Sequence, residues 1–124
     1  MKTNEEILKK IVTAFNTGDL SEVDLIFSQN YIDHQNDQDR PSDSSDGPEE
    51  FKMIVTGARR SLPNLRVMVE DVINSADQIV ARLQWHSIDE VGKKIDRETI
   101  EILKIEGGQV VEHWGAEEWN SGRN

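Results

Sequence analysis

The chain contains no cysteine, few prolines and no long apolar run, and these absences restrict what it can be. Without cysteine it has no disulfide framework, no thiol nucleophile and no cysteine-ligated zinc or iron–sulfur site. No apolar run approaches the roughly 18 residues of a membrane-spanning helix, and the polar N-terminus MKTNEEILKK is unlike a signal peptide. We therefore expect a cytoplasmic protein that does not associate with membranes.

Positive charge is also scarce. The 124 residues include 14 Lys and Arg against 24 Asp and Glu, which gives a formal net charge of −10. Nucleic acids and anionic lipid surfaces bind through clustered Lys and Arg, so neither is an expected partner. Leu, Ile, Val and Phe nevertheless exceed about a fifth of the chain, the level below which a highly charged chain tends to stay disordered. The length then predicts one domain over residues 1–124.

The first half of the chain has the periodicity of helices. Thr3 and Glu6 have capping-box spacing, and the apolar pattern that follows predicts a helix over residues 4–16. A shorter second helix is expected after Ser21, with these apolar residues on one face: Val23, Ile26, Phe27 and Tyr31. Residues 31–34 are then expected to be extended. Residues 35–47 have no apolar side chain and predict a loop or lid, and Pro48 then begins a third helix over 48–61.

The second half alternates with the period of strands. Ile79, Ala81, Leu83 and Trp85 share one face, while Val80, Arg82, Gln84 and His86 share the other. The second face is too polar for a dry core, and it fits a cavity, a wet dimer interface or a solvated surface. Gly107 and Gly108 predict a hairpin before a last strand from Gln109. Helices followed by a strand meander predict an α+β fold, with helices on one face of a bent antiparallel sheet.

Several kinds of catalytic site lack the motifs they need. His34, His86 and His113 have neither HxH nor HExxH spacing, so we expect no metal site. The chain has no GxSxG nucleophile motif and no glycine-rich phosphate loop followed by a helix. Hydrolase triads and nucleotide binding are therefore not expected.

The C-terminal run VVEHWGAEEW, residues 110–119, brings an imidazole, large aromatics and carboxylates to the end of a strand, where they suit a pocket rim. Because strand residues alternate, His113 and Trp114 are expected on opposite faces, and only one of them faces the pocket unless a bulge intervenes. Trp85 fits either the core or a ligand contact. His34 fits either the pocket or a hydrogen-bonded position after the second helix.

The order and spacing of these features resemble the SnoaL-like polyketide cyclases. The segments that carry the resemblance are YIDH (31–34), GPEEFK (47–52), LPNLRV (62–67), VED (69–71), Ala81-Arg82 and Ile105 through Trp114. This family has the NTF2-like α+β cone fold, so the resemblance implies three N-terminal helices packed on a curved antiparallel sheet. It also implies a homodimer formed through the sheet face.

The resemblance implies a cofactor-free intramolecular aldol cyclisation of a polyketide ester. In the family, a carboxylate four residues after the Trp of the His-Trp motif removes and returns protons, and that position is Glu118 here. Family members usually have Asp there, so Glu lengthens the arm by a methylene; Glu117 is the neighbouring alternative. Burial of a carboxylate against apolar side chains raises its pKa, which suits proton transfer near neutral pH.

The sequence thus predicts a cofactor-independent cyclase or isomerase that acts on a small apolar carbonyl or polyketide-like compound in a cone-shaped pocket. Glu118 and His34 are the predicted catalytic residues, and Trp85, His113 and Trp114 are expected to bind substrate. The alternative is a non-catalytic NTF2-like module that binds a small ligand or dimerises. Two departures from the family favour that alternative: the Glu at position 118, and the segment from Trp85 to Gly92, where the family often has Gly-Thr-His-x-Gly and a longer loop.

Overall fold

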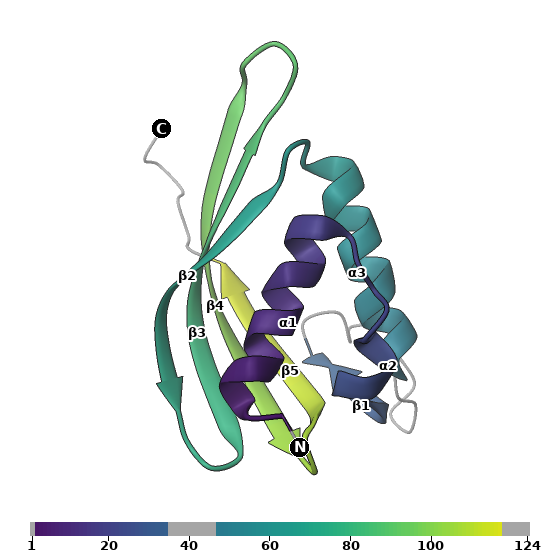
Figure 1. The fold of residues 1–124 in the computed structure, drawn as a ribbon. Helices are drawn as coiled ribbons and strands as arrows, with labels where there is room; N and C mark the ends of the chain where they lie inside the picture. Colours follow the sequence, from purple (N-terminus) through teal and green to yellow (C-terminus); the bar gives the residue numbers. More distant parts are fainter. Residues whose placement is uncertain (1, 35–46, 118–124) are drawn as a thin grey trace.

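A computed structural model describes residues 2–34 and 47–117, in which α1 and α3 lie on one side of a curved, unclosed five-stranded sheet (Figure 1). The elements in chain order are α1 (Asn4–Thr17), α2 (Val23–Ile26), β1 (Phe27–Asp33), α3 (Gly47–Ser61), β2 (Arg66–Asn74), β3 (Gln78–Ile88), β4 (Lys94–Glu106) and β5 (Gln109–Glu117). The expected α+β arrangement is confirmed. Of the predicted loop or lid over residues 35–47, residues 35–46 lie outside the described residues, and Gly47 is already the first residue of α3.

The first helix begins and ends where its capping residues predict. The Thr3 hydroxyl accepts a hydrogen bond from the backbone N–H of Glu6 at 3.1 Å, and the Glu6 carboxylate accepts one from the N–H of Thr3 at 2.8 Å. At the other end Gly18 has φ 80°, and its N–H donates to the carbonyl of Ala14. The predicted helix over residues 4–16 is confirmed, with one further residue at its C-terminus.

The second helix was predicted too long. It spans only Val23–Ile26, and the chain is extended from Phe27 onward as β1. Val23 and Ile26 are buried residues of the helix, whereas Phe27 and Tyr31 are buried residues of β1, whose pairing register is irregular. The four apolar residues have the spacing of a helical face but are divided between two elements, because the chain pairs with β5 at Phe27, Ile32 and Asp33 instead of continuing the helix.

The sheet has the strand order β1-β5-β4-β3-β2. Neighbours from β2 to β5 are antiparallel, as predicted, and Gly107 and Gly108 supply the positive φ angles of the β4–β5 hairpin. The pairing of β1 with β5 departs from the expected antiparallel sheet, because it is parallel and places Asp33 beside His113. The sequence does not predict this pairing, since parallel neighbours are joined by a long connection rather than by a turn.

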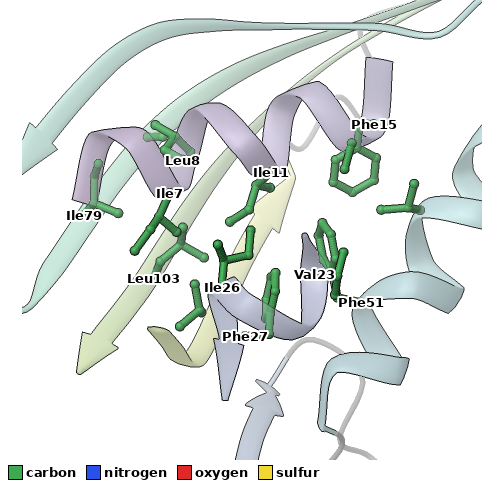
Figure 2. Close-up of a cluster of buried hydrophobic side chains, with 14 of the residues drawn as sticks. Ile7, Leu8, Ile11, Phe15, Val23, Ile26, Phe27, Phe51, Ile79 and Leu103 are labelled. Atoms are coloured by element: carbon green, nitrogen blue, oxygen red, sulfur yellow. The ribbon is translucent and has the colours of Figure 1, made fainter. Parts of the chain in front are cut away.

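The two faces of the sheet differ in what covers them. The face toward the helices, called the inner face here, carries Ile79, Ala81 and Leu83 of β3, which are buried as predicted. Figure 2 shows part of the core between α1 and the sheet, where these labelled residues cluster: Ile7, Leu8, Ile11, Ile26, Phe27 and Leu103. The opposite, outer face carries polar side chains such as Arg82 and His86, which are partly exposed. Burial of the inner face provides the main driving force for packing the helices on the sheet.

Candidate active site

A cavity of about 630 Å³ lies between the helices and the inner face of the sheet. Its size is in the range of small-molecule sites, and most of its wall is apolar. The aromatic members of the wall are Phe15, Phe27, Phe51, Tyr31 and Trp85. Phe15 makes edge-to-face contacts with both Phe51 and Trp85, at ring-centroid distances of 5.6 and 4.9 Å. These contacts hold the rings that shape the wall.

One part of the wall carries an acid–base centre, defined here as Asp33, Glu101 and His113. The Nδ1 atom of His113 lies 3.0 Å from Asp33 Oδ1, and its Nε2 atom lies 2.5 Å from Glu101 Oε1. Asp33 comes from the end of β1, Glu101 from the middle of β4 and His113 from β5. The imidazole therefore bridges two carboxylates supplied by two other strands.

The strand register explains how the three side chains meet. Asp33 is the direct partner of His113 in the parallel β1–β5 pair. Glu101 lies opposite Gly115 in the β4–β5 pair, and His113 is two residues away from Gly115 on the same face. Because Gly115 has no side chain, the space across from Glu101 stays open for the diagonal contact with His113.

Burial makes the charges of this centre interact strongly. The exposed fractions of the side chains are 1% for Asp33, 12% for Glu101 and 13% for His113. The hydroxyl of Tyr31, itself buried, donates to Asp33 Oδ2 at 3.1 Å, so the buried aspartate accepts bonds at both oxygens. Removing water in this way weakens screening and strengthens each charged hydrogen bond.

His113 is held in its charged form. Burial by itself lowers the pKa of His113, but hydrogen bonds and charge attraction from Asp33 and Glu101 outweigh that effect and raise the pKa to about 9. At neutral pH the ring is therefore an imidazolium that donates one N–H to each carboxylate. The centre then carries one net negative charge, from two carboxylates and one imidazolium.

A second polar pair lies on the wall beside this centre. The Nε1–H of Trp85 donates to Thr99 Oγ1 at 2.8 Å, and Thr99 is 8% exposed. Arg97 and Glu117 also line the cavity, and they form a loose ion pair of 3.7 Å with both side chains about half exposed. The polar groups of the wall therefore range from a buried acid–base centre to an exposed rim.

The predicted site residues lie in different places. Trp85 and His113 line the cavity, whereas His34 and Trp114 are absent from its described wall and stack on each other at a ring-centroid distance of 4.7 Å. The prediction that His113 and Trp114 point to opposite faces is confirmed. Glu118 lies outside the described residues, and Glu117 is the last described residue of the chain.

Sequence reasoning did not single out Asp33, Glu101 or Thr99 as site residues. Period-two alternation puts Thr99 and Glu101 on the same face of β4 as buried Leu103, so a carboxylate on an otherwise buried face was an available signal. Asp33 gives no comparable signal, because it appears at the start of an acidic stretch and its partner is 80 positions away. Only the parallel pairing brings it into the site.

Two further properties concern the described residues alone. Within residues 2–34 and 47–117, no group of three or more His, Cys, Asp or Glu side chains is arranged to hold a metal ion. No helix in the same residues is long and apolar enough to cross a membrane.

A family profile described as SnoaL-like polyketide cyclase matches residues 5–119. The chain belongs to this family. The suggested resemblance to SnoaL-like polyketide cyclases is therefore confirmed, and it extends over nearly the whole chain.

Solved structures agree with the SnoaL-like fold. A candidate polyketide cyclase from Bacillus cereus ATCC 10987 is 27% identical, with a TM-score of 0.76 over 90% of this chain and 72% of that one. IdmH from Streptomyces antibioticus is 16% identical, with a TM-score of 0.80 over 94% and 93% of the two chains. A SnoaL-like polyketide cyclase from Agrobacterium tumefaciens C58 is also 16% identical, with a TM-score of 0.77 over 95% and 93%. A comparison with curated proteins found no match.

Proposed function

We propose that this SnoaL-like chain is a cofactor-independent cyclase or isomerase that transfers a proton on a small apolar carbonyl or polyketide-like compound. The observation that carries the proposal is the acid–base centre in the wall of an otherwise apolar cavity. A carboxylate within reach of a carbon acid accelerates proton transfer by about 10²- to 10⁴-fold. The intramolecular aldol reaction of the family begins with such a transfer.

The cavity suits a substrate with apolar rings and few charges. Aromatic and aliphatic side chains make up most of the wall, while the charged groups lie at the acid–base centre and the rim. A ligand oriented by these apolar surfaces presents its reacting carbon to the carboxylates, and orientation itself contributes to the rate. In this proposal Trp85 contacts the substrate from the wall, and His113 holds the carboxylates in place.

Glu118 is a second acid–base group in the proposal, at the position that the family resemblance indicates. Glu117, the residue before it in the sequence, lines the cavity at the rim. The proposal assigns no substrate contact to His34 or Trp114, because neither is among the described residues that line the cavity. Their stacked rings, with Glu112 Oε1 at 3.5 Å from His34 Nε2, belong to the outer face.

A homodimer formed through the outer face is also part of the proposal. This face carries exposed apolar side chains, among them Met68 at 41% and Ile100 at 46%, beside the charged side chains of Arg82 and Glu98. Subunit interfaces combine an apolar centre with a polar rim, so the exposed apolar side chains would lie at the centre and the charged ones at the rim. Light scattering coupled to size-exclusion chromatography tests it: the proposal expects roughly twice the 14.1 kDa chain mass, and a stable monomer contradicts it.

Proton exchange is the direct test of the proposed chemistry. Replacement of α-protons by deuterium in D₂O, followed by NMR, reports proton abstraction without knowledge of the natural substrate. We expect the wild-type protein to accelerate exchange in at least one bicyclic aryl ketone or polyketide ester. The variants His113→Gln and Glu118→Gln are each expected to slow it by about tenfold or more. His86→Gln is the matched control, because His86 also pairs with a carboxylate but lies on the outer face.

The non-catalytic alternative makes the opposite expectation. Its supporting observation is that the two nitrogens of His113 are both engaged by carboxylates, as in a buried structural network. A ligand-binding module would be stabilised against heat by the same ketones without accelerating their exchange. Binding with no exchange, across the whole panel of compounds, would reject the proposed enzyme activity.

A further inference from the structure

The inner face of β4 presents three polar side chains to the cavity in a row. Arg97, Thr99 and Glu101 all line it, and each is separated from the next by one residue. Same-face neighbours on a strand lie about 6.5 to 7 Å apart, so the row runs from the rim to the acid–base centre in evenly spaced steps.

One carboxylate oxygen of Glu101 is directed at His113, and the other is not used in that contact. Oε1 accepts the bond from His113, and in the part of the chain that the structure describes no other hydrogen bond reaches this carboxylate. The described residues also contain no buried side-chain oxygen or nitrogen without a partner. Oε2 is therefore accessible from the cavity, where it can accept a proton.

The hydroxyl of Thr99 accepts a hydrogen bond and can still donate its proton. Its oxygen accepts the N–H of Trp85 at 2.8 Å, and no described residue receives a hydrogen bond from this hydroxyl. A hydroxyl that accepts a bond is polarised and becomes a stronger donor. Trp85 thus both fixes the position of the Thr99 oxygen and favours donation from it into the cavity.

The other donors near the acid–base centre are already used. Both N–H groups of His113 point at carboxylates, and the Tyr31 hydroxyl donates to Asp33. With its pKa raised to about 9, His113 is protonated at neutral pH and has no free nitrogen to act as a base. A base and a donor for the substrate must therefore come from elsewhere on the wall.

We propose that Glu101 and Thr99 act together on one substrate: Glu101 Oε2 removes the proton next to a carbonyl group, and the Thr99 hydroxyl donates a hydrogen bond to the oxygen that becomes the enolate. This assignment rests on the proposed function. Trp85 is the positioning residue for Thr99, and His113 is the positioning residue for Glu101.

The step balances without any further reactant. The C–H bond breaks, an O–H bond forms on Glu101, and the electron pair moves through the carbon–carbon bond to the carbonyl oxygen. In an isomerisation the protonated Glu101 returns the proton to a different carbon. In an aldol reaction the enolate carbon forms a bond to a second carbonyl carbon, and the new alkoxide takes the proton from Glu101.

The spacing of the two residues matches such a substrate. The α-carbon and the oxygen of a ketone are about 2.4 Å apart. Contacts of about 3 Å at each end then span the distance between neighbouring same-face side chains of a strand. The net negative charge of the acid–base centre also disfavours a carboxylate beside the reacting carbonyl. The substrate class is therefore a neutral ketone or ester rather than a keto acid.

The test uses deuterium exchange into 2-tetralone, an apolar bicyclic ketone, together with binding of 2-naphthol, an analogue of its enol. Glu101→Gln is expected to lower the exchange rate constant about 10²- to 10⁴-fold while the dissociation constant of 2-tetralone changes less than about threefold. Glu98→Gln is the matched control, since Glu98 is on the same strand but on the outer face. Glu101→Asp, which keeps the carboxylate, guards against a variant that merely fails to fold.

Thr99 is tested by a pair of substitutions that differ in the hydroxyl. Thr99→Val keeps the shape and removes the donor, and we expect exchange to fall about 10²-fold and 2-naphthol to bind about tenfold more weakly. Thr99→Ser restores the hydroxyl and is expected to stay within about tenfold of wild type. Trp85→Phe should lower the rate more in wild type than in the Thr99→Val background, because the part of its effect that passes through Thr99 is already lost there.

The outcomes separate this proposal from the proposed function. If wild type catalyses exchange and folded Glu101→Gln or Thr99→Val variants match it, the pair is overturned and the function stands. If wild type catalyses no exchange, the proposed enzyme activity and the catalytic roles of Glu101 and Thr99 are all rejected. A 2-naphthol affinity that depends on Thr99 would then indicate a binding site without catalytic activity. Loss of exchange in Glu101→Gln and Thr99→Val, with Glu98→Gln and Thr99→Ser active, supports the pair.

Discussion

The two faces of the sheet each hold a histidine beside a carboxylate, one pair largely shielded from water and the other exposed to it. On the inner face His113 is 13% exposed and its partner Asp33 is 1% exposed. On the outer face His86 and its partner Asp96 are 40% and 62% exposed. The residue types are the same, so the difference between the pairs comes from their surroundings.

This difference determines what each pair contributes. Water competes for an exposed ion pair and screens it, so that such pairs contribute little to stability. A buried pair has lost its water and depends on its partner, and removing one member leaves an uncompensated charge. We therefore expect the inner pair to affect both stability and chemistry, and the outer pair to affect neither strongly.

The largest expected effect is the loss of the Asp33 charge. Asp33→Asn leaves the imidazolium of His113 with one carboxylate and replaces an acceptor of the Tyr31 hydroxyl. We expect the free energy of unfolding to fall by about 3 to 5 kcal/mol, as for other broken buried pairs. Urea-induced unfolding followed by circular dichroism measures it. A loss below about 1 kcal/mol would mean that the inner pair contributes no more to stability than an exposed pair, and the two faces of the sheet would not differ in this respect.

The next effect is the part of the pH dependence of stability that His113 contributes. Its pKa is about 9 in the folded protein, against 6.5 for an unperturbed histidine, because the facing carboxylates of Asp33 and Glu101 favour the protonated ring. The resulting stabilisation is fully present below about pH 6.5 and is lost as the pH rises through about 9. The pKa difference corresponds to about 3 kcal/mol.

The measurement compares wild type with His113→Gln at a series of pH values between about 6 and 10. The difference in unfolding free energy between the two proteins isolates the contribution of this residue. We expect that difference to shrink as the pH rises across the interval. A difference that stays constant over the interval would show that His113 has no raised pKa in the folded protein.

The smallest expected effect is on the outer face. His86→Gln removes the pair with Asp96, and we expect the unfolding free energy to change by less than about 1 kcal/mol, since both side chains are largely exposed. Raising the salt concentration should reduce even that change. A loss as large as that of Asp33→Asn would mean that the outer pair is buried in solution, as it would be at a dimer interface.

The sequence predicts the fold well where local signals are strong. The capping box of Thr3 and Glu6, Pro48 in the first turn of α3 and the alternation from Ile79 to Trp85 all act within a few residues. The helices and the strand that they predict are confirmed, although α3 begins one residue earlier, at Gly47. The second helix failed because Phe27 and Tyr31 fit a helical face as well as a strand. Only a tertiary contact, the pairing with β5, decides between them.

The candidate site is less predictable from the sequence, because it too depends on tertiary contacts between strands. Trp85 and His113 belong to recognisable strand patterns, so their place in the cavity follows from alternation. Asp33 reaches the cavity through a parallel pairing that no local pattern encodes, and Glu101 gains its role from the glycine across from it. The chemistry is thus assembled by register between strands, which a reading of one sequence does not provide.

The pairing of β1 with β5 also sets the order of events during synthesis. Asp33 and His113 are 80 positions apart, and β1 has no other strand neighbour in the described sheet. At about 5 to 20 residues per second, a ribosome needs roughly 4 to 16 seconds to add the intervening segment. Throughout that interval the edge of β1 has no strand to pair with, and Asp33 has no imidazole beside it. A newborn chain therefore passes through a stage in which its first strand is open to other chains, and it acquires the acid–base centre only when its last strand arrives.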